Sequence, residues 1–318
     1  MPQLVAPTGL ILDPLVREHH PGLGHPESPA RFDAVHQGLL RSGLLDRCLK
    51  IAPRRAQDGD LLRCHTPAYL KQVHRDVTCG ARELSTGDTG ICRRSEEVAR
   101  WAAGGLLAAA DALIDGRVSN VFACVRPPGH HASPGRGMGF CIFNSIAVLA
   151  RYLQAVHRLH RLLIVDWDVH HGNGTQAMFW RDPSVLFFST HQMPLYPGSG
   201  HAHERGEGAG EGFTLNCPLR AGDGGREILA AFEQVLLPAA DSFRPEAVLI
   251  SAGFDGRAGD PLGGLLLEDE DFATLTSLLM DVAERHAGGR LIASLEGGYD
   301  LAGLASAVSA HVGALARG

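Results

Sequence analysis

Five short apolar segments alternate with longer segments of helical periodicity between about residue 95 and the end of the chain. Each apolar segment has the length of a buried strand and leads into a polar loop that contains glycine. The five candidate strands are 121–125, 162–165, 185–188, 247–250 and 291–295. This alternation predicts an α/β fold with a mostly parallel sheet, in which the carboxyl ends of the strands lie along one edge and form the crevice for a ligand.

The segments between the candidate strands have apolar residues three or four positions apart, which is typical of helices that pack on a sheet. One helix is predicted to have Ser95 as its N-cap residue and to end near Gly116. Glu96 and Glu97 then lie at the end of the helix dipole that favours acidic side chains. The other predicted helices are 144–158, 226–240 and 268–286.

The composition is that of a globular protein with one substantial core. The chain has 318 residues, of which 45% are hydrophobic and 20% are charged. No linker, charge block or low-complexity tract interrupts the sequence, so we expect a single domain over residues 1–318.

The net charge of -6 gives no electrostatic case for binding nucleic acid or an anionic membrane surface. The first residues lack the basic region and long apolar stretch of a secretory signal. The longest apolar segment, 101–114, is too short to span a bilayer and contains Asp111. The seven cysteines are odd in number and form no CxxC pair, which argues against a disulfide framework. We therefore expect a cytoplasmic protein without nucleic-acid or membrane partners.

The segment DWDVHHGNG follows the candidate strand 162–165 and carries two Asp and two His. Alternate side chains of an extended segment share a face, so Asp166, Asp168 and His170 are expected to point the same way. A carboxylate that leaves water is costly unless it meets a cation or hydrogen-bond donors. Asp168, His170 and, from another loop, Asp255 would supply three ligands to a divalent ion and leave one position open, as in catalytic zinc sites. Such an ion lowers the pKa of bound water to about 7 and polarises a carbonyl.

The loop RPPGHH brings His130 and His131 to the same predicted edge. Imidazole transfers protons near neutral pH, although a hydrogen-bonded structural pair is the plainer alternative. Asp166 and Asn173 favour the catalytic interpretation, because each can accept an N–H from one histidine and fix its orientation. Tyr299 follows two glycines that let the backbone approach the site closely, so its hydroxyl is a candidate donor to an oxyanion. The alternative is a tyrosine that caps a loop.

Other features carry less weight. Residues 206–212, GEGAGEG, match GxGxxG, but no candidate strand precedes them, so a dinucleotide site is not expected. The acidic run 267–272 is interpreted as the solvated start of a helix. His19, His20 and His25 are interpreted either as part of the rim of the site or as surface histidines.

Four motifs, in one order, resemble a known family. They are RPPGHH, DWDVHHGNG, SAGFDGRAGDPLGG and LEGGYD, with HPESPAR upstream at 25–31. The set is similar to the histone deacetylase superfamily, which includes acetylpolyamine amidohydrolases and acetoin-utilisation proteins. RPPG, LEGG and Asn173 are similar to class II members, and a bacterial histone deacetylase-like amidohydrolase is expected. The resemblance implies an arginase-like three-layer α/β fold with a mainly parallel sheet of about eight strands, and zinc-dependent removal of an acyl group from an amine.

By motif position, the resemblance assigns a role to each polar residue. The implied ligands of Zn²⁺, with Fe²⁺ as a further candidate ion, are Asp168, His170 and Asp255. His131 is the implied general base and acid, His130 is mainly electrostatic, and Tyr299 is the implied transition-state tyrosine. The residues that match the orienting partners of the two histidines are Asp166 and Asn173.

The resemblance also implies a structural potassium ion near the zinc, bound by backbone oxygens of Asp166, Asp168 and His170 and by Ser189. The positions that match the tunnel for acyl-lysine are Gly139, Phe140 and Tyr196. Arg31 matches the arginine behind the metal that is associated with acetate release, and Asp88 is aligned with the rim aspartate that holds the substrate backbone.

Leu262 is the position that bears on the substrate. Polyamine-selective members of one eukaryotic branch carry a glutamate here, at the tunnel mouth, that attracts a cationic chain. An apolar side chain suits the aliphatic stem of acyl-lysine better. We therefore predict a zinc-dependent lysine deacetylase that acts on proteins or peptides.

Three alternatives stay open. The first is the same chemistry on acetylpolyamines or another small acylated amine. The second is a catalytically inactive protein that binds acetyl-lysine. The third is a two-metal hydrolase of the arginase type, which needs more bridging carboxylates than SAGFD supplies. Acyl-chain preference, natural target and oligomeric state are encoded in none of these motifs.

Overall fold

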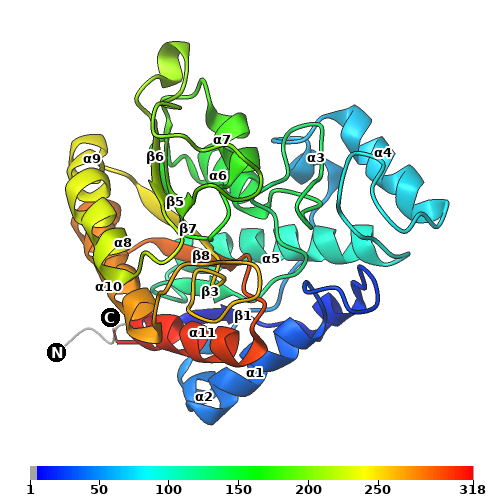
Figure 1. Ribbon diagram of the computed structural model, residues 1–318, viewed down its shortest axis with the longest axis horizontal. Helices are drawn as coiled ribbons and strands as arrows, with labels where there is room; N and C mark the ends of the chain where they lie inside the picture. Colours follow the sequence, from blue (N-terminus) through cyan, green and yellow to red (C-terminus); the bar gives the residue numbers. More distant parts are fainter. Residues whose placement is uncertain (1–5, 318) are drawn as a thin grey trace.

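The computed structural model describes residues 6–317 and contains an eight-stranded sheet whose neighbouring strands are all parallel (Figure 1). In order across the sheet the strands are β2 (Leu49–Lys50), β1 (Gly9–Ile11), β3 (Val121–Ala123), β8 (Leu291–Leu295), β7 (Ala247–Ala252), β4 (Leu162–Asp166), β5 (Val185–Gln192) and β6 (Thr214–Leu219). The predicted α/β fold is confirmed. Residues 1–5, which belong to the segment where no secretory signal was expected, and residue 318 lie outside the described residues.

Helices cover both faces of the sheet (Figure 1). The longer ones are α1 (Ala30–Arg41), α4 (Pro67–Thr78), α5 (Ser95–Ile114), α6 (Ser145–His157), α10 (Asp269–Ala287) and α11 (Leu301–Leu315). The shorter ones are α2 (Leu44–Arg47), α3 (Asp58–Leu61), α7 (Asn173–Phe179), α8 (Gly225–Ala231) and α9 (Leu237–Phe243).

The strand β4 shows why the fold has three layers. Its side chains alternate between the two faces of the sheet, and all of them are buried. Leu162 and Ile164 belong to a core shared with α5 and α6, whereas Leu163 and Val165 belong to one shared with α1, α10 and α11. A strand that is apolar on both faces is typical of a parallel sheet covered on both sides.

Two details of the predicted helices are wrong. Helix α5 has Arg94, not Ser95, as its N-cap residue, because the Ser95 hydroxyl accepts from the backbone N–H of Cys92 at 2.8 Å. The predicted helix 226–240 is three pieces, with a π-helical turn at Phe232–Leu236 between α8 and α9. Pro238 lies in the first turn of α9 and has no N–H for the regular helical ladder, which explains the interruption.

Four strands that precede the motifs, β3, β8, β7 and β4, are consecutive in the middle of the sheet. Because they are parallel, their carboxyl ends meet at one edge, and the four polar loops that follow them lie side by side. The sheet order thus explains how motifs more than 100 residues apart form one site.

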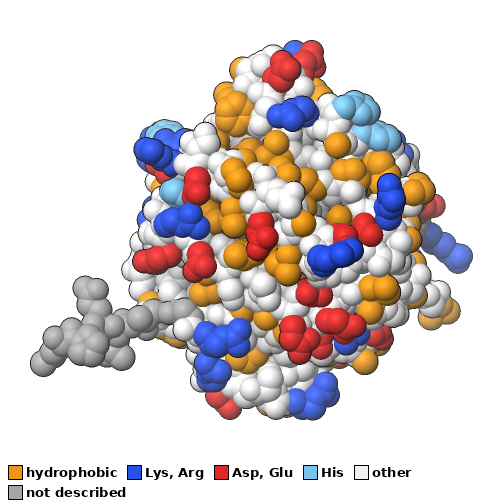
Figure 2. Space-filling view, turned by 60° about the vertical axis from the view of Figure 1, so that its left-hand side comes forward, with side chains coloured by type: hydrophobic (Ala, Val, Ile, Leu, Met, Phe, Trp, Pro, Cys, Tyr) orange, Lys and Arg blue, Asp and Glu red, His pale blue; other side chains and the backbone are white. Residues whose placement is uncertain are grey.

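Acidic, basic and apolar side chains are interspersed on the face of the molecule shown in Figure 2. That face carries no continuous basic surface of the kind that binds nucleic acid. Within residues 6–317, every helix is too short or too polar to cross a membrane.

Candidate active site

Three predicted metal ligands meet where the loops of β4 and β7 lie together. Donor atoms of Asp168, His170 and Asp255 all lie within 4.8 Å of one another. His170 Nδ1 is 3.1 Å from Asp168 Oδ1 and 3.1 Å from Asp255 Oδ2. Both carboxylates are almost completely buried, so the cluster is enclosed by protein on every side except that of His170.

Backbone N–H groups hold the two carboxylates in place. Asp168 Oδ2 accepts from Gly297 N at 2.8 Å, and Asp255 Oδ1 accepts from Val169 N at 2.9 Å. A Cβ atom at Gly297 would lie 2.0 Å from Asp255 Oδ2 and 2.6 Å from Asp168 Oδ2. The loop after β8 can therefore approach the cluster only because residue 297 has no side chain.

The charge of the cluster fits a divalent cation. Burial alone would lower the pKa of His170, but the hydrogen bonds to Asp168 and Asp255 raise it to about 10. Burial, together with Asp168, raises the pKa of Asp255 to about 7. His170 and Asp255 thus hold protons that a metal ion would displace. Two oxygens and one nitrogen suit Zn²⁺ and also Fe²⁺.

Each histidine of the adjacent pair has its own partner. His130 Nδ1 lies 3.0 Å from Asp166 Oδ2, and His131 Nδ1 donates to Asn173 Oδ1 at 2.8 Å. Burial opposes a charge on His130, but Asp168 and Asp166 raise its pKa well above the ordinary value. Burial, His130 and His170 hold the pKa of His131 well below it. His130 is therefore charged and His131 is neutral, with Nε2 free to accept a proton.

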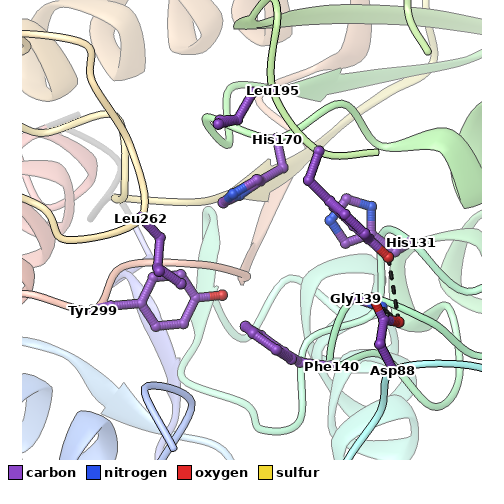
Figure 3. A pocket seen from close by; sticks show the side chains of 9 residues that line it. Asp88, His131, Gly139, Phe140, His170, Leu195, Leu262 and Tyr299 are labelled. Atoms are coloured by element: carbon purple, nitrogen blue, oxygen red, sulfur yellow. Dashed lines mark hydrogen bonds between the residues drawn. The ribbon is translucent and has the colours of Figure 1, made fainter. Parts of the chain in front are cut away.

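His170 connects the cluster to a cavity of about 280 Å³ with mainly apolar walls, which its side chain helps to line (Figure 3). The residues that line it are Asp88, His131, Gly139, Phe140, His170, Leu195, Tyr196, Leu262 and Tyr299. Eight of these nine were predicted, and only Leu195 was not. No polar group or spacing in the sequence marks Leu195, which precedes Tyr196.

The Tyr299 hydroxyl points into this cavity (Figure 3). Burial raises the pKa of Tyr299 well above its ordinary value although Arg31 opposes the shift, so the phenol stays protonated. The Arg31 guanidinium lies 5.0 Å from the centre of the Tyr299 ring and donates through Nε to Gly298 O at 2.7 Å. Arg31 also donates to Glu296 O. It thus lies behind the tyrosine, outside the cavity lining.

The cavity mouth is shaped by Asp88. Its Oδ1 accepts from Gly139 N at 2.8 Å and from the Tyr196 hydroxyl at 3.4 Å. Gly139 and Phe140 are both left-handed, with φ of 55° and 68°, and this turn presents the Phe140 ring to the cavity. The ring of His25 packs edge-on against Phe140 at 4.5 Å, which places His25 at the rim. His20 is exposed.

Of two further residues that the sequence analysis names, His19 is not where it was expected, whereas Ser189 lies next to Asp166. His19 is neither a rim nor a surface residue, because it is fully buried and its Nδ1 is 2.8 Å from the Ser95 hydroxyl. Ser189 lies beside Asp166 in the register of β4 and β5, and its hydroxyl is 2.9 Å from His191 Nδ1. The assignment of Ser189 to a potassium site stays a prediction.

Two further acidic residues touch the site and were not singled out. Glu296 is buried, and its Oε2 accepts from Gly129 N at 2.6 Å and His130 N at 3.1 Å. Asp260 accepts from Tyr299 N at 2.6 Å. Both bind backbone N–H groups across the chain, which no side-chain spacing in the sequence reveals.

The chain matches the model of the histone deacetylase domain over residues 25–315. It is 43% identical to a histone deacetylase-like amidohydrolase of Pseudomonas aeruginosa, covering 87% of this chain and 73% of that protein. A probable deacetylase of Archaeoglobus fulgidus is 38% identical, with 93% and 82% covered. The polyamine deacetylase HDAC10 of Homo sapiens is 43% identical, with 89% of this chain and 43% of that protein covered.

Among solved structures, the HD domain of HDA15 superposes with a TM-score of 0.93 at 37% sequence identity, covering 98% of this chain and 90% of the other. Residues 25–315, which match the histone deacetylase domain model, contain all four motif loops and every strand of the central sheet except β1. With sequence, fold and domain model in agreement, this chain belongs to the histone deacetylase family.

Proposed function

We propose that this chain is a metal-dependent amidohydrolase that removes acetyl or related acyl groups from the ε-amino group of lysine in proteins or peptides. The observation that carries the proposal is the meeting of three groups at the end of one apolar cavity. They are the Asp168, His170 and Asp255 cluster, the neutral imidazole of His131 and the protonated hydroxyl of Tyr299. Residues 1–318 are proposed to act as one deacetylase domain.

The cavity walls suit an aliphatic stem that ends in an amide. Phe140, Tyr196 and Leu262 supply apolar surface along the cavity, and the polar groups lie where it ends. Such a site binds a methylene chain through burial and orients it through a small number of polar contacts.

A divalent ion such as Zn²⁺, held by Asp168, His170 and Asp255, would lower the pKa of water and polarise the amide carbonyl. His131 accepts the proton of the attacking water at Nε2, because its Nδ1–H is donated to Asn173. His130, held charged by Asp168 and Asp166, stabilises the negative charge that develops. Tyr299 donates its hydroxyl to the tetrahedral oxyanion. His131 then protonates the leaving amine.

Backbone oxygens of Asp166, Asp168 and His170, with Ser189, are proposed to hold a structural potassium ion. Arg31 is proposed to assist release of the carboxylate product behind Tyr299. A cytoplasmic location and the absence of nucleic-acid and membrane partners stay predictions from the sequence.

The second candidate is the same hydrolysis on an acetylpolyamine. It is favoured by the 43% identity to the human protein named as a polyamine deacetylase. The neutral side chain of Leu262 at the cavity favours lysine instead, since it offers no charge to attract a cationic chain.

The deciding experiment measures free amine released by purified, zinc-loaded protein, with a chelator-treated control. The substrates are acetyl-lysine peptides, longer acyl-lysine peptides and acetylpolyamines. Turnover of peptides that requires the metal supports the lysine deacylase. Turnover of polyamines alone shifts the assignment to the second candidate, and the absence of turnover by zinc-bound protein contradicts both.

Replacing Leu262 by Glu is expected to shift preference toward acetylpolyamines. A carboxylate at the cavity mouth attracts a cationic chain by about 1 kcal/mol, or roughly fivefold in the ratio of kcat/KM for acetylspermidine to that for an acetyl-lysine peptide. Leu266→Glu is the matched control, because Leu266 is 53% exposed and does not line the cavity. An equal shift in both variants would show that net charge, not the gate position, is responsible.

A further inference from the structure

A single buried carboxylate, that of Asp260, joins two loops of the site. Asp260 is 7% exposed and lies in the loop after β7, between the metal ligand Asp255 and Leu262. Its Oδ2 accepts from Tyr299 N at 2.6 Å and Asp300 N at 3.1 Å. Its Oδ1 accepts from Leu262 N at 2.9 Å. The carboxylate thus connects Leu262, which lines the cavity, to Tyr299, the residue proposed to stabilise the oxyanion.

Asp260 is stabilised by hydrogen bonds from the backbone and not by an ion pair. Within residues 6–317, no Lys, Arg or His side chain lies within 4.0 Å of the Asp260 carboxylate, so backbone N–H groups carry its stabilisation. The bond to Leu262 N is a local turn of the kind that aspartate forms on many loops. The two bonds to the loop of β8 are different, because they link residues 39 and 40 positions apart.

The backbone before Tyr299 gives the tyrosine little restraint of its own. Gly297 and Gly298 precede it, and Gly298 has a φ of 122°, which favours glycine. Gly297 is held through its N–H by Asp168 and through its carbonyl by Phe254 N. Two further bonds restrain the backbone next to the tyrosine. Arg31 binds Gly298 O, and Asp260 binds Tyr299 N. Of these two residues, only Asp260 also binds the residue at the cavity mouth.

We propose that Asp260 is a positioning residue that fixes Tyr299 and Leu262 relative to each other. The inference rests on the proposed function, since it assigns Asp260 a part in that reaction through the Tyr299 hydroxyl. Catalytic groups must be held to within a fraction of an ångström, and a displacement of about 1 Å costs roughly 100-fold. Loss of the carboxylate frees both the oxyanion donor and the wall of the cavity.

The test is a double-mutant cycle of Asp260→Ala with Tyr299→Phe, measured by steady-state kinetics on an acetyl-lysine peptide. In the wild-type background, Asp260→Ala is expected to lower kcat by about 10- to 100-fold. In the Tyr299→Phe background the same change is expected to lower kcat by less than about threefold, because the hydroxyl that it positions is already gone. Equal losses in both backgrounds would overturn the proposal.

Asp260→Asn separates the contact to Leu262 from the contacts to Tyr299 and Asp300. The amide retains one oxygen that accepts from Tyr299 N and Asp300 N, and its NH₂ group then faces Leu262 N. We expect kcat within about threefold of wild type and a KM raised by about threefold or more. If Asp260→Ala does not fold, this split between kcat and KM carries the test. An unchanged KM, or a kcat loss that is as large without the Tyr299 hydroxyl as with it, would count against the proposal.

Hydrogen exchange gives a readout that does not depend on activity. The amides of Leu262, Tyr299 and Asp300 are expected to exchange at least about tenfold faster in Asp260→Ala. Unchanged exchange would overturn the positioning role even if the wild-type protein proved inactive on every acylated amine, which would instead contradict the proposed function.

Asp182→Ala is the matched control for both measurements. Asp182 also accepts from a backbone N–H, that of Ser184 at 2.8 Å, but it lies before β5, at the amino end of the strands. Its loss is expected to leave kcat, KM and exchange at the three amides unchanged.

Discussion

Tyr299→Phe is expected to lower kcat on an acetyl-lysine peptide by about 10²- to 10³-fold and to leave KM within about threefold. The hydroxyl that is removed points into the cavity, where the oxyanion forms only in the transition state. Burial keeps the pKa of Tyr299 well above its ordinary value, so the hydroxyl remains a donor throughout the neutral range. Steady-state kinetics at saturating metal measures the effect.

The phenylalanine keeps the packing of the original ring. Tyr299 meets the Phe140 ring at a centroid distance of 6.0 Å and the Arg31 guanidinium at 5.0 Å, and neither contact uses the hydroxyl. The melting temperature should therefore change little. Tyr152→Phe removes a hydroxyl that is bonded to Asp111, outside the cavity, and should leave kcat unchanged. Full activity of Tyr299→Phe would remove Tyr299 from the mechanism.

The sequence predicted the fold where apolar runs are long enough to show a pattern. All five predicted strands are strands of the sheet, and the loops after four of them lie together at the carboxyl edge. β1 and β2 were missed because they have only three and two residues, too few for any periodicity. β6 was missed because its sequence, TLNCPL, mixes polar residues and a proline, as an edge strand can.

For the site, too, the sequence predicted only those residues that stand in a recognisable motif. Asp166 and Asn173 stand in the same short motif as the metal ligands Asp168 and His170, so their pairing with His130 and His131 could be predicted from the sequence. Asp260 and Glu296 bind backbone N–H groups of distant loops, and only the order of β3, β8 and β7 brings those groups to them. Contacts between a side chain and distant backbone therefore leave no pattern along the chain.

Asp255→Asn is expected to weaken binding of Zn²⁺ by at least about 10³-fold and to abolish metal-dependent turnover. Loss of a residue that only orients a ligand typically costs 10- to 100-fold, and loss of a ligand's charge should cost more. The amide oxygen can still accept from Val169 N, so the loop is expected to keep its shape. Metal content after dialysis and the zinc-induced rise in melting temperature measure binding without any substrate.

The zinc-induced rise in the melting temperature of the wild-type protein is the reference for Asp255→Asn. Zinc at about 100 times its dissociation constant stabilises the folded state by about 2.7 kcal/mol, which raises the melting temperature by roughly 4 °C in a domain of this size. Asp255→Asn should show almost no rise, whereas Asp241→Asn, at an ion pair with Arg285 away from the cavity, should match wild type. Equal zinc content in Asp255→Asn and wild type would contradict the assignment of this ligand.

The pH dependence of the zinc effect provides a second check on the same cluster. Without metal, the raised pKa of about 10 at His170 contributes stability that is fully present below about pH 6.5 and is lost as the pH rises through 10. Zinc binding displaces that proton and the one on Asp255, whose pKa is about 7, so zinc affinity should increase with pH. The zinc-induced rise in melting temperature should therefore be larger at pH 8.5 than at pH 6.5. A rise that does not change with pH would mean that the ion binds without displacing these protons, at a place other than the Asp168, His170 and Asp255 cluster.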